Sequence, residues 1–364
     1  MIDPQSELST TAVALAMRIA HKMGLHRAGQ DTRVPFFEQE MQVRLWWYIR
    51  GLDSRTRRAM GLLATVDDLG DVRLPMNVND ADLHPNMTKP PTVQHTTATE
   101  MVFCLMKYDL WHFVRKSSHF SGSLNPREKA SQLASSTDAE AVTKKQLVLK
   151  EVEGMLKEKY VNHLDTSIPL HRLSAALANI TTHTQKFTMF HPRNQPDGGK
   201  HMSQADQDLV FESSVRLLEL DYEVRDTSFS TLLIDHMACR TQVEALVYMV
   251  SELRQRTSGS LVDTAWGLLA RMHEEQSEVM QGNHRFYIAL ADLTLKAWEA
   301  RWQMLGLHAE SVPTFIEILQ AARGNPGAER SSMADPEDPH FGYMGDIMHD
   351  ETLDWTYWND LLQL

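Results

Sequence analysis

Apolar residues recur along most of the chain at the three- to four-residue spacing of α-helices. The stretch STTAVALAMRIAHKMGLHR opens with Ser and Thr, which are favoured N-caps. One face of the helix predicted there carries five apolar residues: Ala12, Ala16, Ile19, Ala20 and Met23. Gly24 follows at the position where helices commonly end in a left-handed residue. The pattern therefore predicts a first helix that ends at Gly24.

A second helix is predicted over about residues 36–52. Its apolar residues recur at i, i+4, i+8, i+11 and i+15: Phe37, Met41, Leu45, Tyr48 and Leu52. The same helix contains two adjacent tryptophans, Trp46 and Trp47, whose side chains point about 100° apart. Because one thin core stripe does not bury both rings, something else must cover the second one.

The rest of the chain also has helical rather than strand patterning. Residues 61–93 contain four prolines and repeated Asn and Asp, which predicts a long irregular surface loop. Residues 117–138 are typical of a linker. Helical spacing returns over residues 94–117, 138–160, 169–190, 203–224, 229–256, 261–281, 283–306 and 311–323. We predict an all-α fold: a single large domain of about ten helices over residues 1–323.

Residues 324–364 differ in composition from the helical part. From residue 333 onward they carry eight acidic residues and no Lys or Arg, so the net charge of −12 falls to −4 for the rest of the chain. Such a segment is expected to be partly disordered, with one short terminal helix. We treat it as an acidic aromatic tail.

Composition restricts the function classes. The apolar fraction of 42% and the charged fraction of 23% are those of a soluble globular protein. A negative net charge argues against a chain that wraps a phosphate backbone. The two cysteines, Cys104 and Cys239, form no Cys-x-x-Cys pair, so we expect buried free thiols and no thiolate zinc site. With neither a signal-peptide pattern nor a long apolar run, we expect an intracellular chain that does not contact the membrane.

The sequence offers little that indicates catalysis. It has no phosphate-binding loop, no G-x-G-x-x-G and no G-x-S-x-G. The stretch HEEQS, residues 273–277, has Ser where a zinc-binding HExxH motif needs its second His. We therefore predict no enzyme, no catalytic residue, no metal site and no cofactor. The 20 methionines fit either core filling or a pliable pocket for a small apolar effector.

The stretch from residue 16 to residue 61, followed by DVRLPMNVNDADL, resembles the middle homology region of fungal-specific transcription factors, the regulators with a binuclear zinc cluster. The matching elements come in the family's order and spacing. They are Gly24, Leu25, His26 and Arg27 at a helix end, Glu40, the run Arg44, Leu45, Trp46 and Trp47, then Asp53, Gly61, Leu74, Pro75 and Asp80. Later stretches, IPLHRLSAALANI and LDWTYWNDLL, resemble the family's C-terminal half more loosely.

The resemblance implies a regulatory body that acts in the nucleus, shared with the cytoplasm. It implies pathway-specific control of nutrient use or secondary metabolism, coactivator or corepressor partners, and homo- or heterodimers. The zinc cluster of the family is absent from this sequence, so DNA would be reached only through a missing or partner module. The chain also departs from the family at Val43, where an Arg is frequent, and at Leu62, where a polar or basic residue is usual.

The resemblance and the helical pattern together suggest how the second helix is surrounded. In an all-α body a central helix has neighbours on more than one side, so protein can cover both tryptophans. We expect Glu40, Arg44 and Asp53 to form a half-buried charge network beside that helix, engaging His26 or Arg27. The alternative is an exposed i,i+4 pair that contributes a few tenths of a kcal/mol.

The tail interleaves acidic residues with large apolar ones. The candidate residues for contact with a partner are Leu353, Trp355, Trp358, Leu361 and Leu362. Acidic residues keep such side chains in solution until the groove of a coactivator accepts them as an amphipathic helix. The alternative is a terminal helix docked on its own domain through Trp355, Trp358 and Leu362. Two other functions stay open for the whole chain: an interaction partner that titrates a full-length factor, and a small-molecule enzyme without a recognisable motif.

The charge distribution generates one prediction about DNA. We expect the isolated 364-residue chain to bind duplex DNA negligibly at physiological salt, because it offers no basic face to neutralise phosphates. Electrophoretic retardation of duplex DNA measures this. Tight, sequence-selective retardation would contradict the interpretation.

Overall fold

The computed structural model describes residues 7–31, 33–59, 72–92, 95–117, 119, 126–225, 240–275, 285–306 and 312–324. Within these ranges the chain forms eleven α-helices, joined by loops and single 3₁₀ turns, and no strand. The prediction of an all-α fold is confirmed. Gly61, Leu62, Cys239 and the tail residues Leu353, Trp355, Trp358, Leu361 and Leu362 lie outside the described residues.

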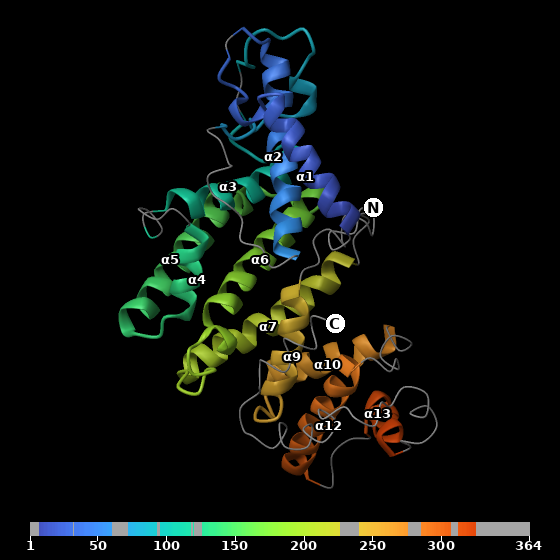
Figure 1. Ribbon diagram of the computed structural model, residues 1–364. Helices are drawn as coiled ribbons and strands as arrows, with labels where there is room; N and C mark the ends of the chain where they lie inside the picture. The colour runs from blue at the N-terminus through green and yellow to red at the C-terminus, as the bar shows by residue number, and fades with distance from the viewer. Residues whose placement is uncertain are drawn as a thin grey trace. The chain divides into compact units, whose positions relative to one another are not determined.

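The helices follow the predicted order closely (Figure 1). They are α1 (Glu7–Lys22), α2 (Phe36–Ala59), α3 (Val102–Lys116), α4 (Pro126–Ser135), α5 (Ala139–Lys159), α6 (Pro169–Phe190), α7 (Gln204–Arg225), α9 (Arg240–Glu252), α10 (Ser260–Glu275), α12 (Arg285–Leu305) and α13 (Thr314–Gly324). None of these helices is both long and apolar enough to cross a membrane.

Two compact units make up the chain. The first comprises Met1–Thr182 with Asp226–His236, and the second comprises His183–Arg225 with Met237–Leu364. The prediction of one domain over residues 1–323 stays a prediction.

The first unit has two large apolar clusters, besides a smaller one between α4 and α5 that is described below. In one, α1 and α2 pack together and are joined by Val72 and by Tyr108 of α3; its largest members are Met17, Leu25, Trp46, Trp47 and Tyr108. In the other, α3, α5 and α6 share a core of Val102, Leu105, Met106, Val152, Leu156, Tyr160 and Ala178. α3 therefore connects the two clusters.

The faces of α1 and α2 that pack inward differ from the most apolar faces read in the sequence. On α1 the core takes Val13, Met17 and Ala20, whereas Ile19 and Met23 are exposed. On α2 the core face includes Val43, Trp46 and Trp47 together with the charged Glu40, while Leu45 and Tyr48 are exposed. Periodicity locates a helix correctly, but it does not choose between two faces that are both partly apolar.

The first helix ends as predicted. Gly24 has φ +78°, and its N–H donates to the carbonyl of His21 at 3.0 Å. A side chain at this φ would be strained, so glycine is favoured here. The 3₁₀ turn Leu25–Arg27 follows directly and buries Leu25.

Residues 117–138 are not the linker that their composition suggested. They contain α4, whose first residue Pro126 suits the first helical position. Leu133 of α4 is buried with Ala141 and Val148 of α5. The ammonium group of the buried Lys145, on α5, donates a hydrogen bond to the carbonyl of Ala134 at 2.7 Å. Burial against α5 therefore outweighs the polar composition of this segment.

The irregular loop expected near residues 61–93 is ordered where the structure describes it. Residues 72–92 run across α2 with one 3₁₀ turn, Asp80–Asp82. The loop extends further than predicted, because α3 begins at Val102 rather than near residue 94. The residues just before α3 are held by hydrogen bonds of side chains rather than by the backbone hydrogen bonds of a helix. Thr99 Oγ1 donates to Asn77 Oδ1 at 2.7 Å, and the Asp80 N–H donates to Glu100 Oε2 at 2.7 Å.

The second unit is built on the pairing of α7 with α9, to which α10 and α12 add. Its fully buried residues include Phe211 and Leu217 of α7, Met249 of α9, Leu269 of α10 and Leu293 of α12. At one point in this unit His191 is fully enclosed: its ring lies 4.6 Å from that of Phe187 and 5.6 Å from that of Tyr248.

The enclosed histidine generates a prediction about pH. Burial, and then the charge of Arg193, hold the pKa of His191 well below its ordinary 6.5. The unfolded chain therefore binds a proton that the folded chain does not, and stability is lost as pH falls below about 6.5. The loss should approach about 1.4 kcal/mol per pH unit.

His191→Asn tests this, because Asn keeps an acceptor for the Arg193 N–H that His191 Nδ1 now accepts. Urea unfolding at about pH 7 and about pH 5.5 gives the two stabilities. We expect the variant to lose less between these pH values than the wild type, whatever its absolute stability. An identical pH dependence in the two proteins would show that His191 does not titrate on unfolding.

Candidate functional site

Glu40 is the centre of a charged cluster on the inward face of α2. Its side chain has 0% exposure. Arg44 Nε donates to Glu40 Oε1 at 3.3 Å, and the backbone N–H of Met76 donates to the same oxygen at 3.0 Å. Arg73 Nη2 lies 2.7 Å from Glu40 Oε2, as an ion pair without hydrogen-bond geometry. Two arginines therefore offset one buried carboxylate.

Arg44 extends this cluster to the surface. Its Nη1 donates to Asp80 Oδ1 at 2.9 Å, and the Asp80 carboxylate is largely exposed. Among the residues singled out in the sequence, Glu40, Arg44 and Asp80 are thus brought together, and Pro75 lies in the same segment next to Met76. The result is a clamp that holds residues 73–80 against α2; we call these contacts the Glu40 cluster.

Asp53 does not join the Glu40 cluster. It is buried in a second group, where Arg50 Nη1 lies 3.2 Å from Oδ2 and Arg57 Nε lies 3.1 Å from Oδ1. Thirteen residues separate Asp53 from Glu40, which is about 20 Å along a helix. The single network that we expected is therefore two separate groups on one helix.

The two tryptophans are covered by different neighbours. Trp46 meets the rings of His21 and His26, with centroids 5.4 and 6.3 Å away. Trp47 lies 5.2 Å from the ring of Tyr108 in α3, and its Nε1–H donates to the carbonyl of Arg73 at 2.8 Å. Both rings are buried by protein, as the resemblance suggested.

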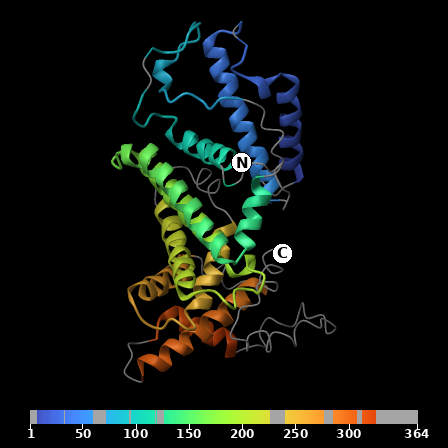
Figure 2. The ribbon, with the colours of Figure 1, turned by 90° about the vertical axis from the view of Figure 1, so that its left-hand side faces the viewer.

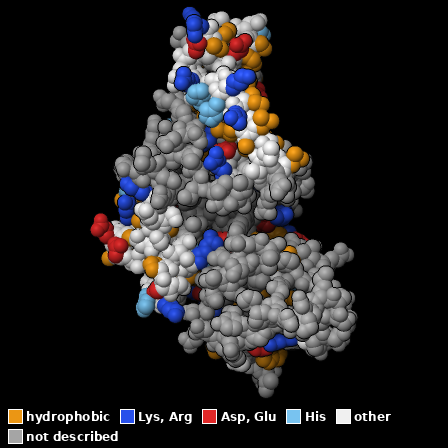
Figure 3. Space-filling model, in the orientation of Figure 1, with side chains coloured by type: hydrophobic (Ala, Val, Ile, Leu, Met, Phe, Trp, Pro, Cys, Tyr) orange, Lys and Arg blue, Asp and Glu red, His pale blue; other side chains and the backbone are white. Residues whose placement is uncertain are grey.

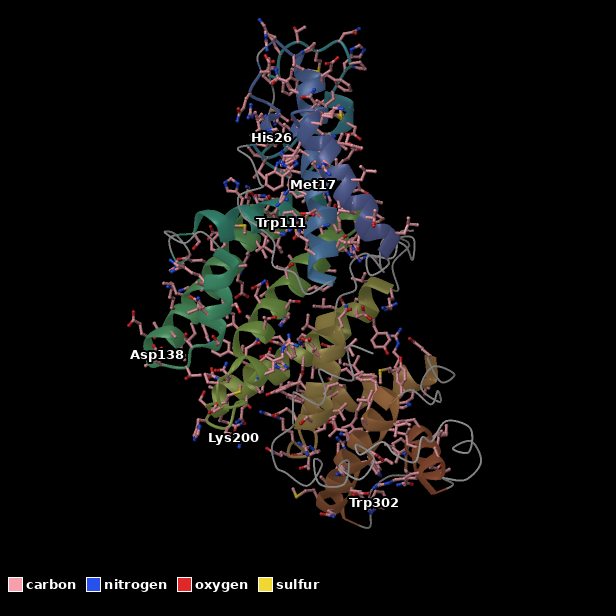
Figure 4. The ribbon with its side chains drawn as sticks, in the orientation of Figure 1. Met17, His26, Trp111, Asp138, Lys200 and Trp302 are labelled. Atoms are coloured by element: carbon pink, nitrogen blue, oxygen red, sulfur yellow. The ribbon has the colours of Figure 1, made fainter. Side chains whose placement is uncertain are left out.

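His26 contacts aromatic rings rather than the carboxylates we expected. It stacks on His21 with centroids 5.1 Å apart. Burial, followed by the charges of Arg27 and His21, lowers the pKa of His26. Arg27 itself is exposed. Met17, His26 and Trp111, from α1, the 3₁₀ turn and α3, lie around α2 (Figure 4). The helix end Gly24–Arg27 thus packs against Trp46.

Sequence reasoning missed several residues of this site. Arg73 is the most important of them, because it supplies the second positive charge at Glu40. A capping box closes the turn at Asp80: the Asn79 N–H donates to Asp82 Oδ2 at 2.8 Å, and His95 Nε2 lies 2.7 Å from the same oxygen. These contacts lower the pKa of Asp82. The position of Arg73 directly before Leu74 and Pro75 was the one signal in the sequence.

A small cavity lies nearby in the first unit. Its volume is about 70 Å³, and it is lined by Met106, Lys107, Leu110 and Trp111 of α3, Leu156 of α5, and Leu177 and Thr181 of α6. Burial lowers the pKa of Lys107. Pockets for drug-sized ligands have about 300–1,000 Å³, so this cavity is suited to a much smaller molecule.

The Glu40 cluster has a structural role: it holds residues 73–80 against α2. Its carboxylate contacts two arginines and a backbone amide. Among the residues that the structure describes, no group of three or more His, Cys, Asp or Glu is placed to hold a metal ion.

Comparison with known proteins gives a match for the N-terminal part of the chain. Residues 5–168 match the family model described as the fungal specific transcription factor domain. These residues include the Glu40 cluster, the Asp53 group and both tryptophans. No solved structure matches the chain.

Three curated relatives match most of the chain. The aurofusarin cluster transcription factor aurR2 of Gibberella zeae is 30% identical over 89% of this chain and 48% of its own length. The pyriculol/pyriculariol biosynthesis cluster transcription factor 1 of Pyricularia oryzae is 27% identical over 84% and 41%. The transcriptional regulator AacuB of Aspergillus aculeatus is 26% identical over 83% and 40%. The chain spans less than half the length of these relatives.

Glu40→Gln tests the role of the cluster. The substitution leaves Arg44 and Arg73 without their shared counter-charge. Breaking a buried pair costs about 3–5 kcal/mol, and both arginines reach water in part, so we expect a loss of about 2–3 kcal/mol. Urea unfolding of the variant measures it.

Asp31→Asn is the matched control, because Asp31 forms an exposed ion pair with Arg33. Its unfolding midpoint should stay at the wild-type value. If Glu40→Gln proved as stable as this control, the cluster would not anchor the segment.

Proposed function

Because residues 5–168 are a fungal specific transcription factor domain, we propose that this chain is the regulatory part of a fungal transcription regulator that controls a secondary-metabolite gene cluster. The observation that carries the proposal is the extent of similarity. Relatives named as regulators, two of them of named clusters, align with more than four fifths of the chain, well beyond residue 168. The proposal places the chain's action in the nucleus and assigns it no catalytic role.

The proposed mode of action is contact with other proteins. We take a protein coactivator or corepressor, rather than a small apolar effector, as its partner. The charge of −12 favours protein partners over direct contact with DNA. DNA would be reached through another module or a partner chain. Any zinc would belong to that module, so the proposal assigns no cofactor to this chain.

The tail has a specific part in the proposal. Its sequence alternates acids with Leu353, Trp355 and Trp358, and then ends in Leu361 and Leu362. We assign to it the recruitment of a coactivator, whose apolar groove would accept these side chains as an amphipathic helix.

A fusion experiment tests this function. The 364-residue chain, joined to a foreign DNA-binding domain, should activate a reporter gene in fungal cells. The double variant Trp355→Ala, Trp358→Ala should reduce activation at least about tenfold, because aromatic anchors carry much of the binding energy in such grooves.

The matched control changes two aromatic residues elsewhere in the tail, Phe341→Ala and Tyr343→Ala, and should keep wild-type activation. Activation that persists in the tryptophan double variant would remove the tail from the mechanism. A fusion that is expressed in the nucleus, stays silent and co-precipitates a full-length relative would favour a titrating partner instead.

A further inference from the structure

Lys107 of α3 carries a partly buried ammonium group that pairs with no carboxylate among the residues that the structure describes. Its Nζ lies 5.4 Å from the ring centroid of Phe103, one turn earlier on the same helix. The titratable groups whose charge acts on it are Cys104, also on α3, and Arg55 on α2. Because burial removes water and no counter-charge replaces it, the charged form of Lys107 destabilises the fold.

Two other lysines of the first unit show how such a group is usually accommodated. Lys145 donates to the carbonyl of Ala134, and Lys159 forms an ion pair with Asp109. Further Lys and Arg side chains project from the surface of the molecule into water, as Figure 3 shows. Lys107 differs from both kinds, because it has neither a printed partner of opposite charge nor full contact with water.

The cavity described above lies beside Lys107, where α3, α5 and α6 meet (Figure 2). Its lining is largely apolar, with the hydroxyl of Thr181 as a polar group from α6. A single water needs about 10–15 Å³ of such space, so a cavity of about 70 Å³ has room for roughly five non-hydrogen atoms. The acyl groups from acetyl to butyryl have this size.

We propose that Lys107 is a modification site: its amine accepts a short acyl group from an acyl thioester, and the acyl chain occupies the cavity. The neutral Nζ attacks the carbonyl carbon of the thioester, so that a C–N bond forms and the C–S bond breaks. The sulfur leaves as a thiolate with the electron pair of that bond, and it takes up the proton that the nitrogen loses. The products are an amide and a thiol, so the step needs no further reactant.

The surroundings of Lys107 favour the neutral amine. Burial lowers the pKa of Lys107, the charge of Cys104 opposes this, and the charge of Arg55 adds to it. At a given pH more of this amine is therefore neutral, and nucleophilic, than of an ordinary lysine. Burial also raises the pKa of the Cys104 thiol, so a thiolate competes little for the thioester. The cavity residues that α5 and α6 contribute carry no charge.

Acylation also suits the folded chain. An amide has no charge, so the modification removes the cost of holding an ammonium without a counter-charge. The acyl carbons occupy apolar space between three helices, and the hydroxyl of Thr181 is available to the new carbonyl. The modified chain should therefore hold α3 more firmly against α5 and α6. This inference does not require that the chain regulate transcription.

Acetyl-coenzyme A tests the reactivity of Lys107. The full chain is incubated with it at several pH values, and site-resolved mass spectrometry measures the acetylation rate of each lysine. At neutral pH Lys107 should react severalfold faster than the exposed Lys157 of α5. As pH rises, the rate at Lys107 should level off below the ordinary lysine pKa of about 10.4, because the amine is already neutral there.

Either of two results would overturn the proposal at this stage. One is a rate at Lys107 no greater than that at Lys157. The other is a rate at Lys107 that keeps climbing up to the ordinary pKa of lysine. Both are read on the unmodified wild-type chain, so they do not depend on the folding of a variant.

Urea unfolding tests the effect of the acyl group on the fold. N-acetyl-lysine placed at position 107 by an expanded genetic code should raise the unfolding midpoint of the full chain. The same residue at position 157 is the matched control, because Lys157 is exposed on the neighbouring α5, and it should leave the midpoint at the wild-type value. An unchanged midpoint at position 107, or an equal rise at both positions, would contradict the proposal.

A substitution in α6 tests where the acyl group lies. Leu177→Phe fills the cavity from the side opposite Lys107's own helix, whereas Leu177→Met conserves the volume and is the control. N-acetyl-lysine at position 107 should raise the midpoint less in Leu177→Phe than in Leu177→Met. An equal rise in the two backgrounds would place the acyl group outside the cavity and overturn the proposal.

Discussion

A carboxylate without exposed surface needs positive charge inside the protein, and Glu40 receives it from two different parts of the chain. Arg44 is one turn further along the same helix, whereas Arg73 belongs to the segment that returns across α2. Burial of Glu40 therefore requires that segment to lie where it does. From this follow the bond of Trp47 to the Arg73 carbonyl and the bond of Arg44 to Asp80. Residues 77–80 then bind residues 95–100, which lead into α3.

Much of this arrangement could be predicted from the sequence, because helix spacing and helix ends are local properties. α5, α6 and α7 lie within a residue or so of their predicted bounds, and the left-handed cap stands at Gly24. The errors concern properties that packing decides. The polar composition of residues 117–138 predicted a linker, but packing against α5 stabilises the helix α4 there. The choice of inward face on α1 and α2 depends on neighbours that periodicity does not reveal.

The Glu40 cluster shows the same difference between features that are local in the sequence and features that depend on packing. The motif residues Glu40, Arg44 and Asp80 could be named in advance, because the resemblance gave their order. Their partners could not, since Arg73 and Met76 approach Glu40 only through the path of an irregular loop. The structure gives these residues a common role: they fix the backbone around two buried tryptophans. The motif that this chain shares with the family is thus a structural anchor, and the proposed contact with a coactivator uses the acidic tail.

Amide hydrogen exchange at Met76 measures the central contact directly, because the Met76 N–H donates to a carboxylate that water does not reach. The account predicts slow exchange at this amide although it lies in an irregular loop, and fast exchange in Glu40→Ala, with the amide of Val43 in α2 still protected. Exchange of Met76 at the rate of an open loop in the wild type would contradict the account.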